Sequence, residues 1–367
     1  MIKIGFDARH FSQKKTGIGR YIENLVITLI ENFEDLEIIL FTYDKINFEK
    51  NRIKILPIPP PSKELKKIFS PFWLNFLLPT FLKKYKIDIL HSPNFLCPLN
   101  YKGKIIITIH DLAPFFYPDA FGKIYPFYMK TLLPYSIKKA DRIIVPTKMI
   151  EEEVKKLFPF AEKKTVCIYE GVNKKIRPLK FNEKIYPYLL YVGTIEKRKN
   201  ILNLIKSFEI LKEKYKIPHF LYLVGKKGPG YKEIFSYISK SKFKEFIIYE
   251  GYVEENKLIK IYSNCDIFIY ISLYEGFGLP VLEAMKCEVP VVVSKRENFV
   301  EITKGAAKYV DPLNIEEITT EILKLINSKE EKEKLIEKSR EIVKNFSWEK
   351  TAIQTYKIYK EVLENKN

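Results

Sequence analysis

The sequence of 367 residues lacks the marks of several protein classes. Its four cysteines are widely separated and form no CxxC pair, which argues against a zinc site and a disulfide framework and favours a reducing compartment. No apolar run reaches the roughly 18 to 20 residues of a transmembrane helix, and the N-terminus has no signal-peptide core. The dinucleotide fingerprint GxGxxG and the Walker A pattern are also missing. These absences favour a cytoplasmic protein without a metal site.

Acidic residues are scarce relative to basic ones. Lys and Arg total 63 and Asp and Glu total 45, which gives a net charge of +18. This surplus predicts a negatively charged partner, and nucleic acid, an anionic membrane surface and nucleotide phosphates all satisfy it. The abundance of Lys, Ile and Glu is also typical of a thermophile or an AT-rich genome. Because no nucleic-acid module is recognisable, a basic nucleic-acid-binding protein is the weaker alternative.

The order of apolar segments predicts an α/β fold with two doubly wound, Rossmann-like domains. Strands are expected at residues 2–6, 36–42, 88–91, 104–109, 141–146 and 165–169, and the alternation stops at the charged, aperiodic residues 173–187. It restarts with expected strands at residues 188–192, 220–224, 246–250, 266–271 and 289–293. We therefore expect domains at residues 1–172 and 188–346, a linker at 173–187, and a final helix within 347–367 that begins at an N-cap, Ser347.

The stretch from Glu275 to Met285, EGFGLPVLEAM, joins an expected strand to an expected helix through a Gly-x-Gly turn. Gly276 and Gly278 let the backbone approach a ligand closely, and the helix that follows points unpaired N–H groups into the same space. Glu275 and Glu283 could then act as two fixed acceptors beside a diphosphate or a polyhydroxylated ring. The alternative is an ordinary strand-to-helix connection with solvated glutamates.

Two loops of the first half also follow expected strands. The run TGIGRY contains Gly17 and Gly19 and leads into a helical pattern, so the backbone there could approach a ligand. His110 follows the strand expected at 104–109, and loops after parallel strands line the ligand crevice of such folds. A plain turn and a structural histidine are the alternatives at these two places.

A cationic segment, GTIEKRKN, opens the second half at residues 193–200. Here an expected strand ends in glycine, and Arg198 and Lys199 lead into a helix. The planar guanidinium of an arginine and the ammonium of a lysine, placed beside a helix N-terminus, are suited to binding a diphosphate. A solvated loop is the alternative.

The segment from Ser62 to Lys86 combines a bulky apolar centre with six lysines and one glutamate. Aromatic residues flanked by lysines are typical of an element that lies on an anionic bilayer. Pro71 and Pro79 interrupt the segment too early for a membrane span. The segment therefore either rests on a membrane surface or packs into the core.

Together these motifs resemble the family 4 retaining glycosyltransferases of the GT-B fold, over nearly the whole chain. The resemblance rests on EGFGLPVLEAM, which matches the family's Glu-x7-Glu motif, and on YVGTIEKRKN, TGIGRY, IHDL and the Ser-Trp-Glu at residues 347–349. It implies an N-terminal acceptor domain and a C-terminal nucleotide-sugar domain facing across a cleft, with the last helix crossing back onto the N-terminal domain.

The resemblance also implies roles for individual residues. Glu283 would bind the ribose of the donor, and Glu275 would hold the donor sugar together with the backbone at Gly276, Phe277, Gly278 and Leu279. Arg198 and Lys199 would neutralise the diphosphate in place of a metal ion, in agreement with the lack of any Asp-x-Asp pair. The remaining implied contacts are a loop approach to the phosphates at Gly17 and Gly19, His110 near the reacting sugar and acceptor, and backbone contacts from Val253 to the base.

Two positions depart from the family pattern. Many relatives carry a basic residue directly after the glycine at position 193, whereas this chain has Thr194. The expected clamp then depends more on Arg198 and Lys199. Glu288 stands where glycine is usual, which we expect to affect only a turn.

The resemblance implies a metal-independent transferase, with no cofactor, that transfers a hexose with retention from a nucleotide sugar to a saccharide or lipid-linked acceptor. The TGIGRY opening is similar to that of mannosyltransferases of cell-surface polysaccharide synthesis, so GDP-mannose is the expected donor, with a UDP-sugar as the other choice. A lipid-linked acceptor would place the protein at the inner face of the membrane. A nucleotide-sugar epimerase of related architecture is the alternative activity, and no nucleic acid is expected as a partner.

Overall fold

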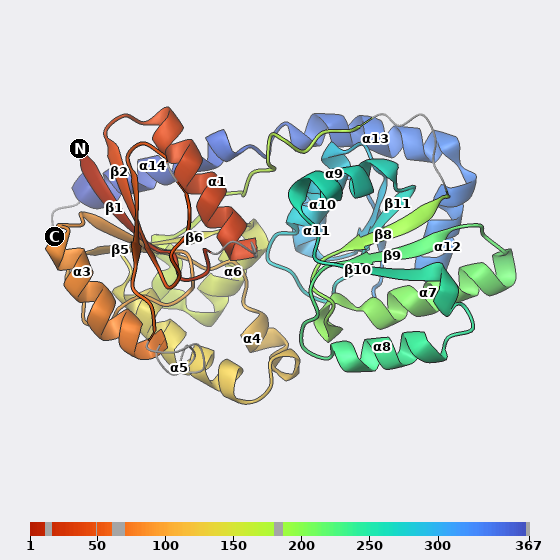
Figure 1. Ribbon diagram of the computed structural model, residues 1–367, viewed down its shortest axis with the longest axis horizontal. Coiled ribbons are helices and arrows are strands. Elements are labelled where there is room, and N and C mark those ends of the chain that lie inside the picture. Colours follow the sequence, from red (N-terminus) through yellow and green to blue (C-terminus); the bar gives the residue numbers. More distant parts are fainter. Residues whose placement is uncertain (12–16, 49, 61–69, 180–185, 365–367) are drawn as a thin grey trace. The chain divides into compact units, whose positions relative to one another are not determined.

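The computed structural model describes residues 1–11, 17–48, 50–60, 70–179 and 186–364. Thr16 of the TGIGRY loop, residues 62–69 of the lysine-rich segment and residues 180–185 of the expected linker lie outside the described residues. The chain forms two compact units (Figure 1). Unit 1 comprises residues 1–112, 126–171 and 347–367, and unit 2 comprises residues 113–125 and 172–346.

In the described part of unit 1, seven parallel strands form one sheet in the order β3-β2-β1-β4-β5-β6-β7. The strand order reverses between β1 and β4, and parallel sheets of this kind bind ligands beside the carboxyl ends of the strands at such a reversal. The strands are β1 (Ile2–Asp7), β2 (Leu36–Thr42), β3 (Ile53–Pro57), β4 (Ile89–Ser92), β5 (Lys104–Thr108), β6 (Arg142–Val145) and β7 (Thr165–Cys167).

Helices cover both faces of this sheet. Successive residues of a strand face opposite sides of the sheet. On one side, Ile4 and Phe6 of β1 belong to a core that includes residues of α1 and α14. On the other side, Gly5 lies against Leu82 of α3. The helices of unit 1 are α1 (Gly17–Asn32), α3 (Leu78–Lys84), α5 (Ile124–Lys139), whose first two residues group with unit 2, α6 (Lys148–Leu157) and α14 (Trp348–Glu364).

The last helix returns to the first unit, as the family resemblance implied. Figure 1 shows α14 beside α1, and Trp348, Ala352 and Tyr359 are buried in the core that these two helices share. Gly171 makes the return geometrically feasible, because a side chain there would lie 2.2 Å from the backbone nitrogen of Trp348. The hydroxyl of Ser347 accepts a hydrogen bond from the backbone of Lys350 (3.3 Å), so the expected N-cap is confirmed.

The described part of the Ser62–Lys86 segment packs one of its sides into unit 1. A π-helical turn (Trp73–Leu77) leads into α3, and Trp73, Leu78 and Leu82 are completely buried. Phe72 and Phe76 remain exposed. Core packing therefore accounts for one side of the segment and leaves the other side unexplained.

In the described part of unit 2, six parallel strands form a sheet in the order β10-β9-β8-β11-β12-β13, which reverses between β8 and β11. The strands are β8 (Tyr188–Val192), β9 (Phe220–Val224), β10 (Ile247–Gly251), β11 (Ile267–Tyr270), β12 (Val291–Ser294) and β13 (Lys308–Val310). The helices are α4 (Ala113–Phe116), α7 (Ile201–Tyr215), α8 (Tyr231–Lys240), α9 (Glu255–Asn264), α10 (Leu279–Lys286), α11 (Glu297–Thr303), α12 (Ile315–Asn327) and α13 (Lys329–Val343). The expected Rossmann-like arrangement is thus present in both units.

Three local features differ from or add to the expectations. Strands β3 and β13 and helices α4, α5 and α11 were not predicted, and residues 113–125 group with unit 2 although they precede the expected linker. Glu288 adopts a left-handed backbone (φ 60°), which is the conformation that favours glycine, and both of its carboxylate oxygens accept hydrogen bonds from Arg340 (2.9 and 2.7 Å). Within the described residues, no helix is both long and apolar enough to cross a bilayer.

Candidate functional site

The strand reversal in unit 2 brings together two of the motifs that the sequence singled out. The loop after β8 carries Arg198 and Lys199 in a short 3-10 turn, and the loop after β11 carries Glu275. Since β8 and β11 are neighbours in the sheet, both loops leave its carboxyl edge side by side. This is the position at which parallel sheets bind their ligands.

Glu275 is the centre of a buried polar cluster. Its Oε1 accepts hydrogen bonds from the Lys199 ammonium, from the Tyr270 hydroxyl (3.0 Å) and from the Ser272 hydroxyl (2.9 Å). The Tyr270 ring stacks on Tyr191 with centroids 5.6 Å apart, which holds the phenol in place. The carboxylate of Glu275 is therefore fixed from three directions.

Arg198 extends the cluster toward a second carboxylate. Its guanidinium donates to the Tyr274 carbonyl (2.6 Å) and to Glu196 (2.8 Å), and its Nη1 lies 3.6 Å from Glu275 Oε2. The side chains of these two cations and two carboxylates are each about a tenth exposed. Two positive and two negative charges thus balance within a space that excludes most water, where an unpaired charge would be unstable.

The electrostatics keep Glu275 ionised. Burial alone would raise the pKa of Glu275, but Lys199 and Arg198 outweigh burial and lower it. Burial, only partly offset by Glu275, lowers the pKa of Lys199. Burial and the neighbouring Glu275 raise the pKa of Tyr270 well above its usual value, so its hydroxyl stays protonated and serves as a donor.

The Gly-x-Gly turn requires glycine at its second position. Gly278 has φ 109°, and a side chain there would lie 2.7 Å from the ring of Phe299. The Phe277 carbonyl accepts a hydrogen bond from Asn298 (3.2 Å), which fixes the turn to α11. Helix α10 then begins at Leu279 with proline in its first turn, as the sequence indicated.

Glu283 is buried on α10, one turn into the helix. The hydroxyl of Tyr262, on α9, donates to Glu283 Oε2 (3.0 Å). Val253 is buried in the loop between β10 and α9. The described contacts therefore connect Glu275 with Arg198 and Lys199, and they connect Glu283 with Tyr262 of α9.

In unit 1, His110 follows β5 and pairs with Glu170. Its Nδ1 lies 3.0 Å from Glu170 Oε1, and both side chains are nearly buried. Its Nε2 is buried and has no hydrogen-bond partner among the described residues. If Nδ1 carries the proton that Glu170 accepts, Nε2 keeps a lone pair that can accept a hydrogen bond from a ligand.

Tyr21 connects His110 to the glycine loop. It lies in α1 just after Gly17 and Gly19, and its ring packs edge-on against the His110 ring with centroids 4.7 Å apart. A side chain at Gly17 would meet no described atom within 4 Å. The sequence-predicted residues of the first half are thus gathered in one region of unit 1.

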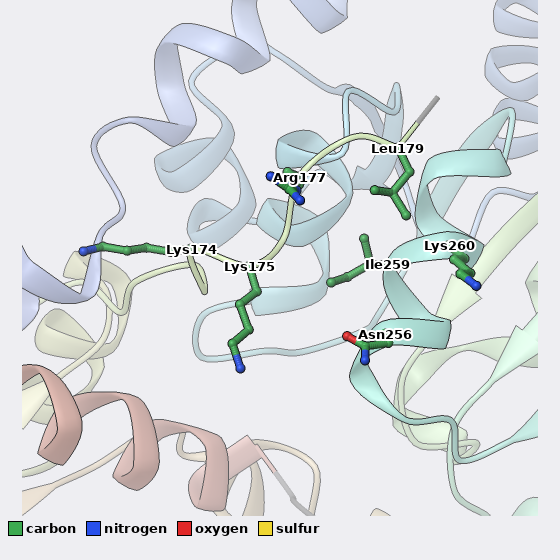
Figure 2. Close-up of a pocket in the computed structure, with 7 residues that line it drawn as sticks. All are labelled: Lys174, Lys175, Arg177, Leu179, Asn256, Ile259 and Lys260. Carbon is green, nitrogen blue, oxygen red and sulfur yellow. The ribbon is translucent and has the colours of Figure 1, made fainter. Parts of the chain in front are cut away.

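A cationic cavity lies elsewhere in unit 2. It has a volume of about 640 Å³, and Figure 2 shows it between the segment 174–179 and α9, with Leu179 and Ile259 facing the same space. Its remaining lining residues are Lys174, Lys175, Arg177, Lys260 and Asn256, all of them exposed. None of the predicted site residues lines this cavity, so it is separate from the cluster around Glu275.

Two family models match the chain in succession. Residues 15–175 match the model described as glycosyltransferase family 4, and residues 172–342 match the model described as glycosyl transferases group 1. The chain belongs to the group 1 and family 4 glycosyltransferases. The Glu275 cluster lies within the second match and His110 within the first.

Relatives and solved structures agree with this assignment. The glycosyltransferase is 29% identical to the O-antigen chain mannosyltransferase B of Escherichia coli over 384 residues, which cover 98% of this chain and 100% of the relative. Its fold is similar to that of a sucrose-phosphate synthase from Thermosynechococcus elongatus (TM-score 0.82, 19% identity, 100% of both chains). It is also similar to Anabaena Alr3699/HepE in complex with UDP-glucose (TM-score 0.78, 14% identity, 98% of this chain and 100% of that one).

The sequence motifs predicted some residues of the Glu275 cluster in unit 2 and of the His110 region in unit 1, and they missed others. Glu196, Ser272 and Tyr270 hold the cations or the carboxylate of the unit 2 cluster, and Tyr262 and Glu170 hold Glu283 and His110. Glu196, Ser272 and Glu170 lie within a few residues of the carboxyl end of an expected strand, which is the one signal that could have found them. Tyr262 lies within α9, and nothing in the local sequence marks it.

Proposed function

We propose that this glycosyltransferase transfers mannose from GDP-mannose to a saccharide or lipid-linked saccharide acceptor in the synthesis of a cell-surface polysaccharide. The observation that carries the proposal is the buried cluster of Arg198, Lys199 and Glu275 at the strand reversal of unit 2. The name of the E. coli relative, which is matched over its whole length, supports mannose. The Anabaena protein was solved in complex with UDP-glucose, which makes UDP the second nucleotide to test.

The proposed donor contacts are those that the family resemblance implies for residues of unit 2. Glu283 accepts hydrogen bonds from the ribose hydroxyls, while Val253 meets the base through its backbone. Glu275 accepts from the donor sugar, which also contacts the backbone at Gly276, Phe277, Gly278 and Leu279. Rigid support from Tyr262, Tyr270 and Ser272 favours such contacts, because acceptors that are already oriented lose little entropy on binding.

Arg198 and Lys199 supply the positive charge that stabilises the departing diphosphate, so the reaction needs no metal ion. Both cations are already paired with Glu196 and Glu275. The diphosphate therefore shares these cations with the two carboxylates. Because the cluster is fixed and mostly dry, it stabilises developing charge without reorganising at the moment of reaction.

The proposed transfer retains the configuration of the donor sugar. The acceptor hydroxyl attacks the anomeric carbon from the side that the nucleotide leaves. The bond from that carbon to the diphosphate oxygen breaks as the new glycosidic bond forms, and the diphosphate oxygen takes the acceptor proton. Glu275 acts as a positioning group, since its Oε1 already accepts three hydrogen bonds. Unit 1 contributes His110 near the sugar and acceptor, and its loop at Gly17 and Gly19 approaches the phosphates.

A thermal-shift screen tests the donor. GDP and GDP-mannose should raise the melting temperature more than UDP, ADP, dTDP and their sugars, because a ligand stabilises the folded state by binding to it.

Replacing Arg198 and Lys199 together by alanine should lower kcat/KM by roughly a thousandfold or more, since each is a charged group that would stabilise the charge developing on the diphosphate. Glu283→Ala should raise the donor KM by about tenfold or more.

Glu288→Ala is the matched control, because this glutamate follows α10 but pairs with Arg340 at the surface. It should leave the donor KM unchanged. A melting temperature that responds to none of the nucleotides, or normal kinetics in the Arg198 and Lys199 variant, would overturn the proposal. Turnover of a nucleotide sugar without any acceptor, beyond slow hydrolysis, would show an epimerase instead.

A further inference from the structure

Leu273, two residues before Glu275, has both of its backbone polar groups fixed by hydrogen bonds. Its N–H donates to the carbonyl of Arg198 (2.9 Å). The guanidinium of Arg198 also donates to the carbonyl of Tyr274, the residue between Leu273 and Glu275 (2.6 Å). The backbone that leads into Glu275 is therefore part of the buried cluster of unit 2.

The carbonyl of Leu273 is held by α4 and the residue that follows it. The hydroxyl of Tyr117 donates to this carbonyl (3.1 Å). The rings of Phe116 and Tyr117 lie against the ring of Tyr274, with centroids 5.7 and 5.6 Å from it. Tyr274 is only 7% exposed. The loop before Glu275 is thus supported by a second element besides the Arg198 turn.

Tyr117 reaches this loop from a distant part of the chain. Residues 113–125 group with unit 2, whereas the rest of that unit begins at residue 172. Tyr117 is itself held by its neighbours, since its N–H donates to the Ala113 carbonyl (2.8 Å) and its carbonyl accepts from Ala120 (3.1 Å). A phenylalanine would satisfy the ring contact with Tyr274 equally well. The hydroxyl is therefore the group that serves the loop backbone.

We propose that Tyr117 is a positioning residue of the donor site, which fixes the backbone before Glu275 so that this carboxylate stands where the donor sugar binds. Tyr117 acts through Leu273 and Tyr274. A binding group that is already oriented loses little entropy when its ligand binds, so the support of the loop strengthens the contact with the sugar. The inference deepens the proposed function and rests on it for the identity of the ligand.

Hydrogen exchange of the full chain without nucleotide tests the support of the loop. Tyr117→Phe keeps the ring and removes only the hydroxyl. The amides of residues 273–276 should then exchange about three- to tenfold faster than in the wild type, because one hydrogen bond to this loop is lost. Tyr117→Ala also removes the ring contact with Tyr274 and should exchange faster still. Exchange at the wild-type rate in Tyr117→Phe would overturn the proposal.

Calorimetric titration with GDP and with GDP-mannose tests the consequence for the donor sugar. Tyr117→Phe should bind GDP as the wild type does and should bind GDP-mannose about three- to tenfold more weakly, because only the contact between Glu275 and the sugar is disturbed. An equal weakening for both ligands would indicate a general loss of structure. That result, or unchanged binding of both ligands, would contradict a positioning role.

Tyr101→Phe is the matched control. Tyr101 is also half-buried, and its hydroxyl donates to the Ile87 carbonyl (3.2 Å) near the amino ends of β4 and β5 in unit 1. Its variant loses the same kind of hydrogen bond, so its melting temperature should change to a similar extent. Exchange at residues 273–276 and binding of GDP-mannose should stay at the wild-type level.

The inference and the proposed function fail separately. If the wild-type chain binds neither GDP nor GDP-mannose, UDP and UDP-glucose take their place in the titration. A chain that binds none of these nucleotides contradicts the proposed function. The exchange experiment contains no nucleotide, so its result decides in that case too whether Tyr117 supports the loop before Glu275.

Discussion

Glu275 stabilises two buried cations that would each be unstable alone. Arg198 and Lys199 follow one strand and Glu275 follows its neighbour, so the ion pairs also fix two loops to each other. The sequence motifs indicated all three residues. They did not assign partners to these residues, because the hydrogen bonds that Tyr270, Ser272 and Glu196 make to Glu275 or Arg198 depend on how the loops pack; a place near the end of an expected strand marks Ser272 and Glu196 only as candidates.

Glu170 is expected to act through His110. Glu170→Gln should lower kcat by roughly ten- to a hundredfold with little change in KM, because the imidazole loses the partner that orients its Nε2. Steady-state kinetics of Glu170→Gln, His110→Ala and the double variant measure this coupling. The double variant should be no slower than His110→Ala alone.

Glu151→Gln provides the comparison at the same scale. Glu151 is also a nearly buried carboxylate of unit 1, but it pairs with Lys148 and Lys155. Its replacement should leave kcat unchanged. If the fold-losses of kcat in the two single variants multiply in the His110 and Glu170 double variant, a positioning role for Glu170 is contradicted.

At the scale of elements, the sequence pattern predicted the short apolar runs that form buried strands. Strands 36–42, 188–192 and 220–224 were predicted with the observed bounds because each is a short, mostly buried apolar run. Helix α5 was missed because its apolar residues occur on both sides and Pro134 lies inside it. Strand β3 was missed because it is only partly buried and lies at the edge of the sheet.

Helix α14 is joined to the sheet of unit 1 through His91, on β4. The two ring nitrogens of His91 lie 2.7 Å from the Tyr359 hydroxyl and 2.8 Å from the Thr108 hydroxyl. Burial, assisted by His110, lowers the pKa of His91 to about 3. Since the unfolded chain takes up this proton near pH 6.5, the stability that depends on neutral His91 is complete above pH 6.5 and is lost as the pH falls toward 3.

Thermal denaturation between pH 7.5 and 5.5 measures this effect. The free energy of unfolding should fall by about 1.4 kcal/mol over this range through His91 alone, which corresponds to a melting temperature about 3 to 5 °C lower. His91→Gln should be less stable at pH 7.5 but should lose this part of the pH dependence. His10→Gln, which changes an exposed histidine, should keep it. An unchanged slope in His91→Gln would contradict the assignment.

At the scale of the whole molecule, the sequence indicated two Rossmann-like folds and the return of the last helix. It did not indicate that residues 113–125 group with unit 2. There the hydroxyl of Tyr117 donates to the Leu273 carbonyl (3.1 Å), and Phe116 packs on Tyr274. Such contacts depend on the folded partner, so a division of the chain by composition could not reveal them.

Removing residues 347–367 should destabilise unit 1 and spare unit 2, although unit 2 is the part that precedes the cut. Trp348, Ala352, Ile358, Tyr359 and Val362 belong to the core that contains residues of β1, β2 and α1. Hydrogen exchange should therefore show lost protection in these elements, with β8, β9 and β11 still protected.

Ile353→Ser is the control, because Ile353 lies on the exposed side of the same helix. Its exchange pattern should match that of the wild type. Equal loss of protection in the two sheets after the truncation would contradict the separate stabilities of the two units.

The return of α14 also has a consequence for synthesis on the ribosome. Every residue of unit 2 is translated before residue 347, whereas the core of unit 1 needs side chains that follow it. Although residues 1–112 of unit 1 are translated before unit 2, the core of unit 1 is completed only after unit 2 has been translated. The nascent chain consequently carries an open apolar face on α1 and β1 during the whole translation of unit 2, which is the interval in which a chaperone would be needed.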